Sequence, residues 1–211
     1  SLVSGQDDPL VGAVIDKSAE TGMCICFGYV GEGPAIRQAV VEDGRVVGIY
    51  DKTHLGDREE AVMVPGDSLD VFRTSRAVIG VQLCWEAHFP EISTTYALKG
   101  TDIILMPFAS GLGGERRRSS WNRLIPARAY DNTVYAGACN ACGPTGAGTT
   151  LGGGAAIYDP RGMLMAEGYS GECMVSAELT AEPLERIRAE GYENMRDLYF
   201  LDKRRPELYF R

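Results

Sequence analysis

Two short and almost wholly apolar runs place the strongest constraint on the fold of this 211-residue chain. Residues 77–83 and 101–107 each have the length of a strand, and a segment with helical character, residues 90–99, separates them. A strand whose side chains are apolar on both faces is typical of a parallel sheet that other layers cover. Strand and helix alternate through this middle part, so the sequence predicts a layered α/β fold.

Helices, hairpins and loops are expected around this central unit. Helices are predicted at residues 9–20, around 119–131 and at 182–190. Further strands are predicted at residues 23–30, 71–72, 133–139 and 173–178. Turn residues predict hairpins about 42–45 and 159–162, and the expected loops are 51–68, 109–114 and 143–154. No internal repeat or linker is visible, which favours a single domain over 1–211 with a tail from about residue 182.

The composition excludes several classes of function. The net charge is −8 at pH 7, and an acidic surface repels the phosphates of nucleic acids. The one basic run, residues 116–118, is short and is interpreted as part of a solvated loop. Apolar runs stay far below the roughly 20 residues of a membrane span, and no signal peptide is visible. We therefore expect a cytoplasmic protein without a membrane or nucleic-acid partner.

Six cysteines occur in a chain that is long enough to build a core without disulfides. This agrees with a reducing compartment such as the cytoplasm. Cys139 and Cys142 have the spacing of a metal or redox pair, but a zinc site needs two further ligands and the chain has only two histidines. The two cysteines are interpreted as small buried residues at the end of a strand, and neither a metal nor another cofactor is expected.

Cys84 is the residue that most strongly suggests chemistry. It follows the apolar strand at 77–83, and the helix at 90–99 begins six residues later. A thiol at the end of a strand is held firmly, and backbone N–H groups in a strand-to-helix turn can stabilise an oxyanion. Free cysteines are also common as small apolar residues in protein cores. The pattern alone leaves two interpretations open, a nucleophile and an inert buried thiol.

Several motifs resemble those of one enzyme family and occur in the same order. Residues 82–91 (Gln-Leu-Cys-Trp-Glu-Ala-His-Phe-Pro-Glu) are similar to the nucleophile motif of the carbon–nitrogen hydrolases, also called the nitrilase superfamily. The segments that resemble its other motifs are 50–55, Glu59 with 64–67, 98–102 with Pro107, Trp121 with Arg128, Ala129 and Asn132, 159–162, and 204–209. The resemblance covers about residues 46–209 and implies an α-β-β-α sandwich.

The resemblance also implies a mechanism built on a cysteine, a lysine and carboxylates. Cys84 would attack the carbon of an amide, a carbamoyl compound or a nitrile, and Lys52 would lower the pKa of the thiol. The Lys52 ammonium and the backbone N–H of Trp85 would stabilise the oxyanion. Glu59 is the expected supporting acid beside Lys52, and Glu60 is its alternative. Candidates for lining the substrate pocket are Trp121, Phe108 and His88.

One part of the family pattern is not found. The family's general base is a glutamate that follows a proline early in the chain, and no Pro-Glu pair precedes Lys52. The family's first strand and helix also lack a counterpart, so we expect a chain without its N-terminal segment. A fragment of a longer protein, a truncated inactive relative, and replacement of the base by another carboxylate are all open. A lost strand exposes backbone and apolar surface, which favours association.

Two hypotheses about function follow from the resemblance. The first is hydrolysis of a small linear amide, carbamoyl compound or nitrile through an acyl-enzyme or thioimidate on Cys84. An amidase is favoured over a nitrilase because Phe89, Pro90 and Glu91 resemble the amidase and carbamoylase branches. The second is a non-catalytic subunit or binding partner. The resemblance further implies a homodimer or larger homo-oligomer, and no cofactor.

Overall fold

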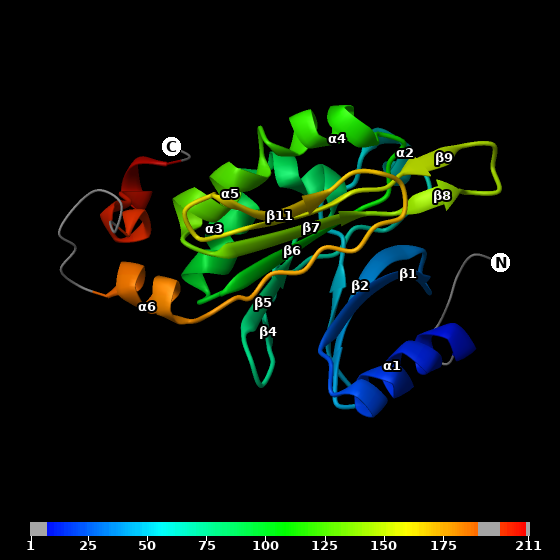
Figure 1. Cartoon of the computed structure of the whole chain (residues 1–211), viewed down its shortest axis with the longest axis horizontal. Helices are drawn as coiled ribbons and strands as arrows, with labels where there is room; N and C mark the ends of the chain where they lie inside the picture. The colour runs from blue at the N-terminus through cyan, green and yellow to red at the C-terminus, as the bar shows by residue number, and fades with distance from the viewer. Residues whose placement is uncertain (1–7, 190–198, 210–211) are drawn as a thin grey trace.

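Two β-sheets stack face to face, and helices cover the outer side of each (Figure 1). The computed structural model describes residues 8–189 and 199–209. Helix α1 (Pro9–Thr21) packs against the smaller sheet. Helices on the far side of the larger sheet are α3 (Pro90–Leu98), α4 (Gly114–Trp121) and α5 (Ile125–Asn132). The predicted α-β-β-α sandwich is confirmed.

The smaller sheet is antiparallel and is built from consecutive strands. They are β1 (Ile25–Gly31), β2 (Ala35–Glu42) and β3 (Arg45–Asp51), in the order β1-β2-β3. Asp43 and Gly44 both have positive φ, 49° and 72°, which is the backbone of a tight two-residue hairpin. The hairpin that the Asp-Gly pair predicts is therefore confirmed, and Lys52 follows directly at the end of β3.

The larger sheet has the order β11-β10-β7-β6-β5-β4. Its strands are β4 (Phe72–Arg73), β5 (Val78–Val81), β6 (Ile103–Phe108), β7 (Tyr135–Asn140), β10 (Ala155–Tyr158) and β11 (Leu164–Gly168). β5, β6 and β7 are parallel, and the outer pairs are antiparallel. The carboxyl ends of the three parallel strands consequently meet at one edge, where open α/β sheets bind ligands.

Two groups of buried side chains hold the layers together. One fills the space between the larger sheet and its helices, with Ile104, Trp121 and Ile125 fully buried. The other lies between the sheets and joins Val40 and Tyr50 to residues of the larger sheet such as Val81. Each fully buried Val, Leu or Ile contributes about 1.5–3 kcal/mol. The central strands are therefore covered on both faces, as the sequence predicted.

Two predicted segments have a finer structure than the sequence indicated. The helix expected around 119–131 is divided into α4 and α5, and Pro126 lies in the first turn of α5. Proline suits a first turn but lacks the N–H that a helix interior needs, which explains the division. The expected loops contain the short helix α2 (Asp57–Glu60) and a hairpin of β8 (Cys142–Pro144) and β9 (Thr150–Gly152).

Three other predictions were wrong. Residues 173–178 form no strand, because no neighbouring strand pairs with them, and Met174 is 92% exposed. Cys139 and Cys142 are exposed rather than buried, and both are free thiols. Residues 116–118 belong to helix α4, and Arg117 is buried at 2% exposure. The residue types in these three segments do not show which other parts of the chain pack against them.

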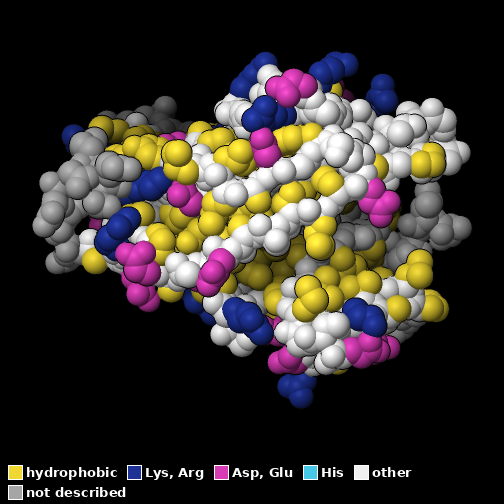
Figure 2. Space-filling view, in the orientation of Figure 1, with side chains coloured by type: hydrophobic (Ala, Val, Ile, Leu, Met, Phe, Trp, Pro, Cys, Tyr) yellow, Lys and Arg dark blue, Asp and Glu magenta, His cyan; other side chains and the backbone are white. Residues whose placement is uncertain are grey.

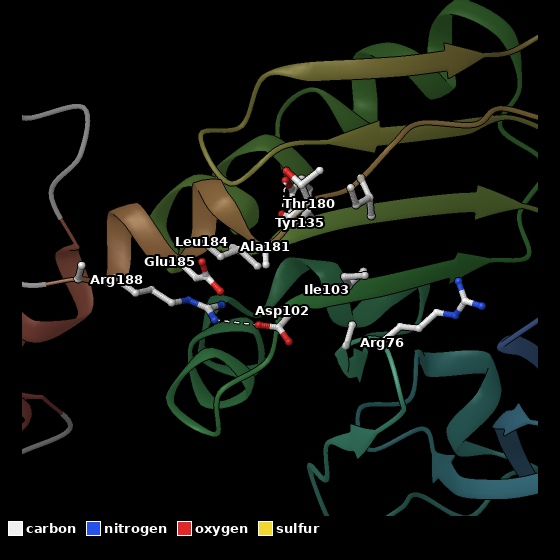
Figure 3. Close-up of a pocket in the computed structure, with 12 residues that line it drawn as sticks. Arg76, Asp102, Ile103, Tyr135, Thr180, Ala181, Leu184, Glu185 and Arg188 are labelled. Atoms are coloured by element: carbon white, nitrogen blue, oxygen red, sulfur yellow. Dashed lines mark hydrogen bonds and ion pairs between the residues drawn. The ribbon is translucent and has the colours of Figure 1, made fainter.

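The C-terminal part docks at the amino ends of the parallel strands. Helix α6 (Glu182–Arg188) agrees with the charged helix predicted at 182–190, and the tail continues as short 3-10 helices at Phe200–Lys203 and Pro206–Leu208. Residues 190–198 and 210–211 of the predicted tail lie outside the described residues. A cavity of about 740 Å³ lies beside α6, where Arg188 pairs with Asp102 at 2.8 Å (Figure 3).

Over residues 8–189 and 199–209, the structure shows no helix that is long and apolar enough to cross a membrane.

Candidate active site

A cavity of about 700 Å³ opens between the two sheets at the carboxyl ends of the parallel strands. Hydrophobic side chains gather in the hollow between the sheets in Figure 2. The polar residues Lys52, Glu59 and Asn140 line the cavity together with Cys84. The apolar lining comes from both sheets and includes Phe27, Val30, Ile36, Leu83 and Phe108. The cavity can therefore hold a small organic molecule against a thiol and a cation.

Cys84 lies in a tight turn between β5 and α3. Its φ of +43° is in the left-handed region, which costs a non-glycine residue roughly 1–2 kcal/mol. Hydrogen bonds around the turn offset this cost, since Glu86 N–H donates to the Leu83 carbonyl at 2.8 Å. The side chain of Gln82 donates to the carbonyls of Glu86 and Phe89 at 2.6 and 3.1 Å. Strain held in this way is typical of functional turns.

Lys52 and Glu59 form a largely buried ion pair in the lining of the cavity that Cys84 also lines. The Lys52 Nζ lies 2.5 Å from Glu59 Oε2, and the lysine side chain is only 3% exposed. Glu59 also accepts the N–H of Gly56 at 2.8 Å, which fixes the short helix α2. Glu60 is exposed on the other side of the loop. The sequence analysis named Glu59, with Glu60 as its alternative, as the acid beside Lys52, and in the structure Glu59 contacts Lys52.

Two loops at the cavity mouth are joined by the side chain of Asn140. Its amide donates to the carbonyls of Ser110, Leu112 and Gly153 at 3.0–3.2 Å, and its oxygen accepts from Ser110 N–H at 3.0 Å. The amide therefore uses both of its polar ends to connect residues 110–112 with residue 153. The loops expected at 109–114 and 143–154 are held in a defined shape at this point.

Arg117 is a buried cation close to this mouth. Its guanidinium lies 5.1 Å from the ring centres of both Phe108 and Trp121, and it donates to Ser110. Among the residues that the structure describes, no carboxylate lies within ion-pair distance of it. Burial lowers the pKa of Arg117, and the nearby Cys84 opposes that effect. A positive charge is thus held behind the cavity wall, and the sequence analysis did not expect it.

The remaining predicted site residues separate into two groups. Phe108 lines the cavity beside Cys84. Trp121 is fully buried behind Phe108, and its ring centre lies 5.1 Å from that of Phe108. His88 lies outside the cavity lining and packs on the exposed side chain of Trp85. The structure therefore places Phe108 in the same cavity lining as the thiol, but not Trp121 or His88. Trp85 directly follows Cys84 in the 3-10 turn Cys84–His88.

Glu86 and Asn140 are site residues whose roles the sequence analysis missed. Both follow apolar runs, and a polar residue directly after a buried strand is the only signal that could have indicated them. The structure shows Glu86 fully buried between the lysine segment and the cysteine turn. Its partners Tyr50, Thr53 and His54 lie more than 30 residues away, so no local pattern in the sequence contains them.

In the described part of the chain, no group of three or more His, Cys, Asp or Glu side chains could hold a metal ion. The cysteines at 24, 26, 84, 139, 142 and 173 are all free thiols.

Comparison with known sequences agrees with this geometry. The sequence profile described as Carbon-nitrogen hydrolase matches residues 5–189. The chain is 30% identical over 175 residues to the omega-amidase NIT2-A of Xenopus laevis, covering 77% of this chain and 63% of that protein. It is 28% identical over 155 residues to the deaminated glutathione amidase of Escherichia coli O157:H7, covering 71% and 57%. The chain thus spans less than two thirds of these relatives.

Solved structures with a similar fold were found as well. A carbon–nitrogen hydrolase from Helicobacter pylori G27 superposes with a TM-score of 0.81 at 26% identity, over 93% of this chain and 72% of that one. A mutant amidase from Nesterenkonia sp. AN1 has a TM-score of 0.77 at 25% identity, over 96% and 72%. That structure carries the acetamide moiety of fluoroacetamide bound covalently to its active-site cysteine.

Proposed function

The chain belongs to the carbon–nitrogen hydrolase family, and we propose that it hydrolyses the carbon–nitrogen bond of a small linear amide through an acyl-enzyme on Cys84. One observation carries the proposal. A single cavity is lined by a cysteine in a strained turn and by a buried lysine that is paired with a carboxylate. A cation close to a thiol favours the thiolate, which is the nucleophilic form.

The proposed reaction has two halves. In the first, the Cys84 sulfur attacks the carbonyl carbon, and the Lys52 ammonium and the Trp85 backbone N–H stabilise the oxyanion that forms. The carbon–nitrogen bond then breaks, and ammonia or an amine leaves with the proton that the thiol released. In the second half, water attacks the thioester carbon, the acid product leaves, and the thiol regains a proton.

A carboxylate has to move these protons, and the cavity offers one. Among the described residues that line it, Glu59 is the sole carboxylate. Its side chain is 33% exposed, so water can reach it, and it lies against Lys52. We assign Glu59 first to the support of Lys52, and it is the available group in this chain for passing protons to and from water.

An amide is the proposed substrate class rather than a nitrile. The similarity to an omega-amidase, to a deaminated glutathione amidase and to an amidase with a modified active-site cysteine supports this choice. Carbamoyl compounds and nitriles present an equally electrophilic carbon and are the alternatives. A cavity of about 700 Å³ is large enough for any of these in linear form.

The test combines turnover with alkylation of the thiol. We expect purified protein to release ammonia from butyramide and to be alkylated once, rapidly, by iodoacetamide at neutral pH. Cys84→Ala should remove the rapid alkylation and lower turnover about a thousand-fold or more, because the nucleophile is gone. Cys142→Ala, which removes an exposed thiol outside the cavity lining, should change neither. Equal alkylation of all three proteins would contradict the proposal.

A second candidate is a non-catalytic family member that binds amides or a partner protein. It is favoured by the fact that Glu59, the sole described carboxylate of the cavity lining, is already engaged by Lys52. The same experiment separates the two functions. Rapid alkylation of Cys84 together with the absence of ammonia release from amides, carbamoyl compounds and nitriles would favour the non-catalytic role.

We also propose that the protein works in the cytoplasm as a homodimer or larger homo-oligomer. The free state of the six cysteines supports a reducing compartment. Exposed apolar residues along β11, namely Met163, Leu164 and Met165, support association of copies. Neither proposal requires a nucleic acid or a cofactor.

A further inference from the structure

Glu86 is a fully buried carboxylate on which five hydrogen bonds end. Its Oε1 accepts the backbone N–H groups of Thr53 and His54 at 2.9 and 3.1 Å. The same oxygen accepts the hydroxyls of Tyr50 and Thr53 at 2.6 and 2.8 Å. Its Oε2 accepts the N–H of Leu83 at 2.7 Å. Every partner is a donor, which is the arrangement that an ionised carboxylate requires when it is buried.

These hydrogen bonds end on the direct neighbours of the two proposed reacting groups. Thr53 follows Lys52, and Leu83 precedes Cys84. The backbone of Lys52 is otherwise bonded to the carbonyl of Ile36 and the N–H of Gly66, both at 2.9 Å and both away from the cysteine turn. One side chain thus connects the lysine segment to the cysteine turn, across the boundary between the two sheets.

We propose that Glu86 is a positioning residue, which sets the ammonium of Lys52 against the thiol of Cys84. This inference rests on the function proposed above and adds a residue that does not touch the substrate. A displacement of about 1 Å in such a site can lower the rate about 100-fold. The two reacting groups come from different sheets, so a rigid connection between them has a direct effect on the reaction.

Glutamine cannot replace this carboxylate, although it has the same shape. Its NH₂ group would meet either the N–H of Leu83 or those of Thr53 and His54, and in both cases donor would face donor. Hydroxyls can rotate to a new partner, whereas these three backbone N–H groups cannot. Glu86→Gln should therefore separate the lysine segment from the cysteine turn while it preserves side-chain volume.

The test measures the pH profile of Cys84 alkylation by iodoacetamide, together with kcat and KM for butyramide. In Glu86→Gln we expect Cys84 to be alkylated more slowly than in the wild type, because Lys52 is no longer held in place in the cavity that Cys84 lines. We expect kcat to fall about 100-fold with KM changed by less than about three-fold. Glu91→Gln, an exposed acid five residues further on, should match the wild type in all three quantities.

The outcomes distinguish this inference from the proposed function. A wild-type protein that shows neither rapid alkylation nor turnover contradicts the proposed function itself. A wild-type protein that shows both, beside a Glu86→Gln variant with the same profile and the same kcat, overturns only the positioning role. A fall in thermal stability without a change in the alkylation profile of the folded variant would likewise reduce Glu86 to a structural residue.

A milder variant keeps the test valid if Glu86→Gln does not fold. Tyr50→Phe removes one of the five hydrogen bonds and leaves the buried ring in place. We expect a change in the same direction, with kcat lowered about five-fold, as for the loss of a single hydrogen bond. A Tyr50→Phe variant with wild-type alkylation profile and kcat would count against the connection that we propose.

Discussion

Glu59 and Glu60 are adjacent in the chain, yet the fold gives them different surroundings. Glu59 faces inward to Lys52, whose side chain is almost fully buried, and Glu60 faces solvent. A buried ammonium without a partner is costly, and it either loses its proton or moves. At the scale of the residue, one position in the sequence therefore separates the acid that pairs with Lys52 from a surface acid.

The pair offers a matched prediction. Glu59→Gln should lower kcat/KM about 100-fold, because Lys52 loses the carboxylate that holds its ammonium in place. Glu60→Gln makes the same chemical change one residue later and should stay within about two-fold of the wild type. Steady-state kinetics on butyramide would check both variants. An equal effect of the two would mean that the ion pair has no role in the reaction.

Helix α6 is joined to the larger sheet by an arginine, and its side chains Leu184 and Ile187 are buried. Arg188 donates to Asp102 at 2.8 Å (Figure 3), and it also donates to the carbonyls of Thr101 and Thr133 at 2.6 and 3.1 Å. These groups lie at the amino ends of β6 and β7, opposite the cavity that contains Cys84. At the scale of the element, α6 therefore belongs to the stability of the fold rather than to the reaction.

We expect Arg188→Met to lower the free energy of unfolding by about 2 kcal/mol, since it leaves buried carbonyls and Asp102 without their donor. Lys17→Met, on helix α1, removes an exposed pair with Glu20 and should cost less than about 0.5 kcal/mol. Urea denaturation measures both values. A lower activity of Arg188→Met without a loss of stability would contradict this assignment.

At the scale of the whole molecule, each of the two sheets ends in strands that pair with a neighbour on one side only. β1 and β11 are edge strands among the described strands. Leu164 on β11 is 42% exposed, and Met163 just before it is 65% exposed. An edge strand with apolar side chains is a surface on which copies of a chain associate.

We therefore expect light scattering to give a mass that is a multiple of 22.8 kDa. Leu164→Lys should shift the mass towards that of one chain, because an edge charge blocks pairing of strands. Val62→Lys alters another exposed apolar residue, 62% exposed, in a loop outside β11 and should leave the mass unchanged. A single-chain mass for the wild type would contradict the proposed oligomer.

The sequence alone determined the layered architecture, and it named the candidate site residues. The apolar runs that became β5 and β6 are local patterns, and a strand that is apolar on both faces has to be buried. Cys84, Lys52 and Glu59 could be named from motifs, because their residue types and spacing are properties of the chain. The structure has placed the three around one cavity, and their roles stay predictions.

Only the tertiary structure decided which polar groups meet. It placed Glu86 between the lysine segment and the cysteine turn, buried Arg117 against two aromatic rings, and left residues 173–178 without a partner strand. It also exposed two cysteines that the sequence had suggested were buried. Burial, pairing and hydrogen bonding depend on neighbours that are distant in the chain, and the sequence of one segment does not contain the position of another.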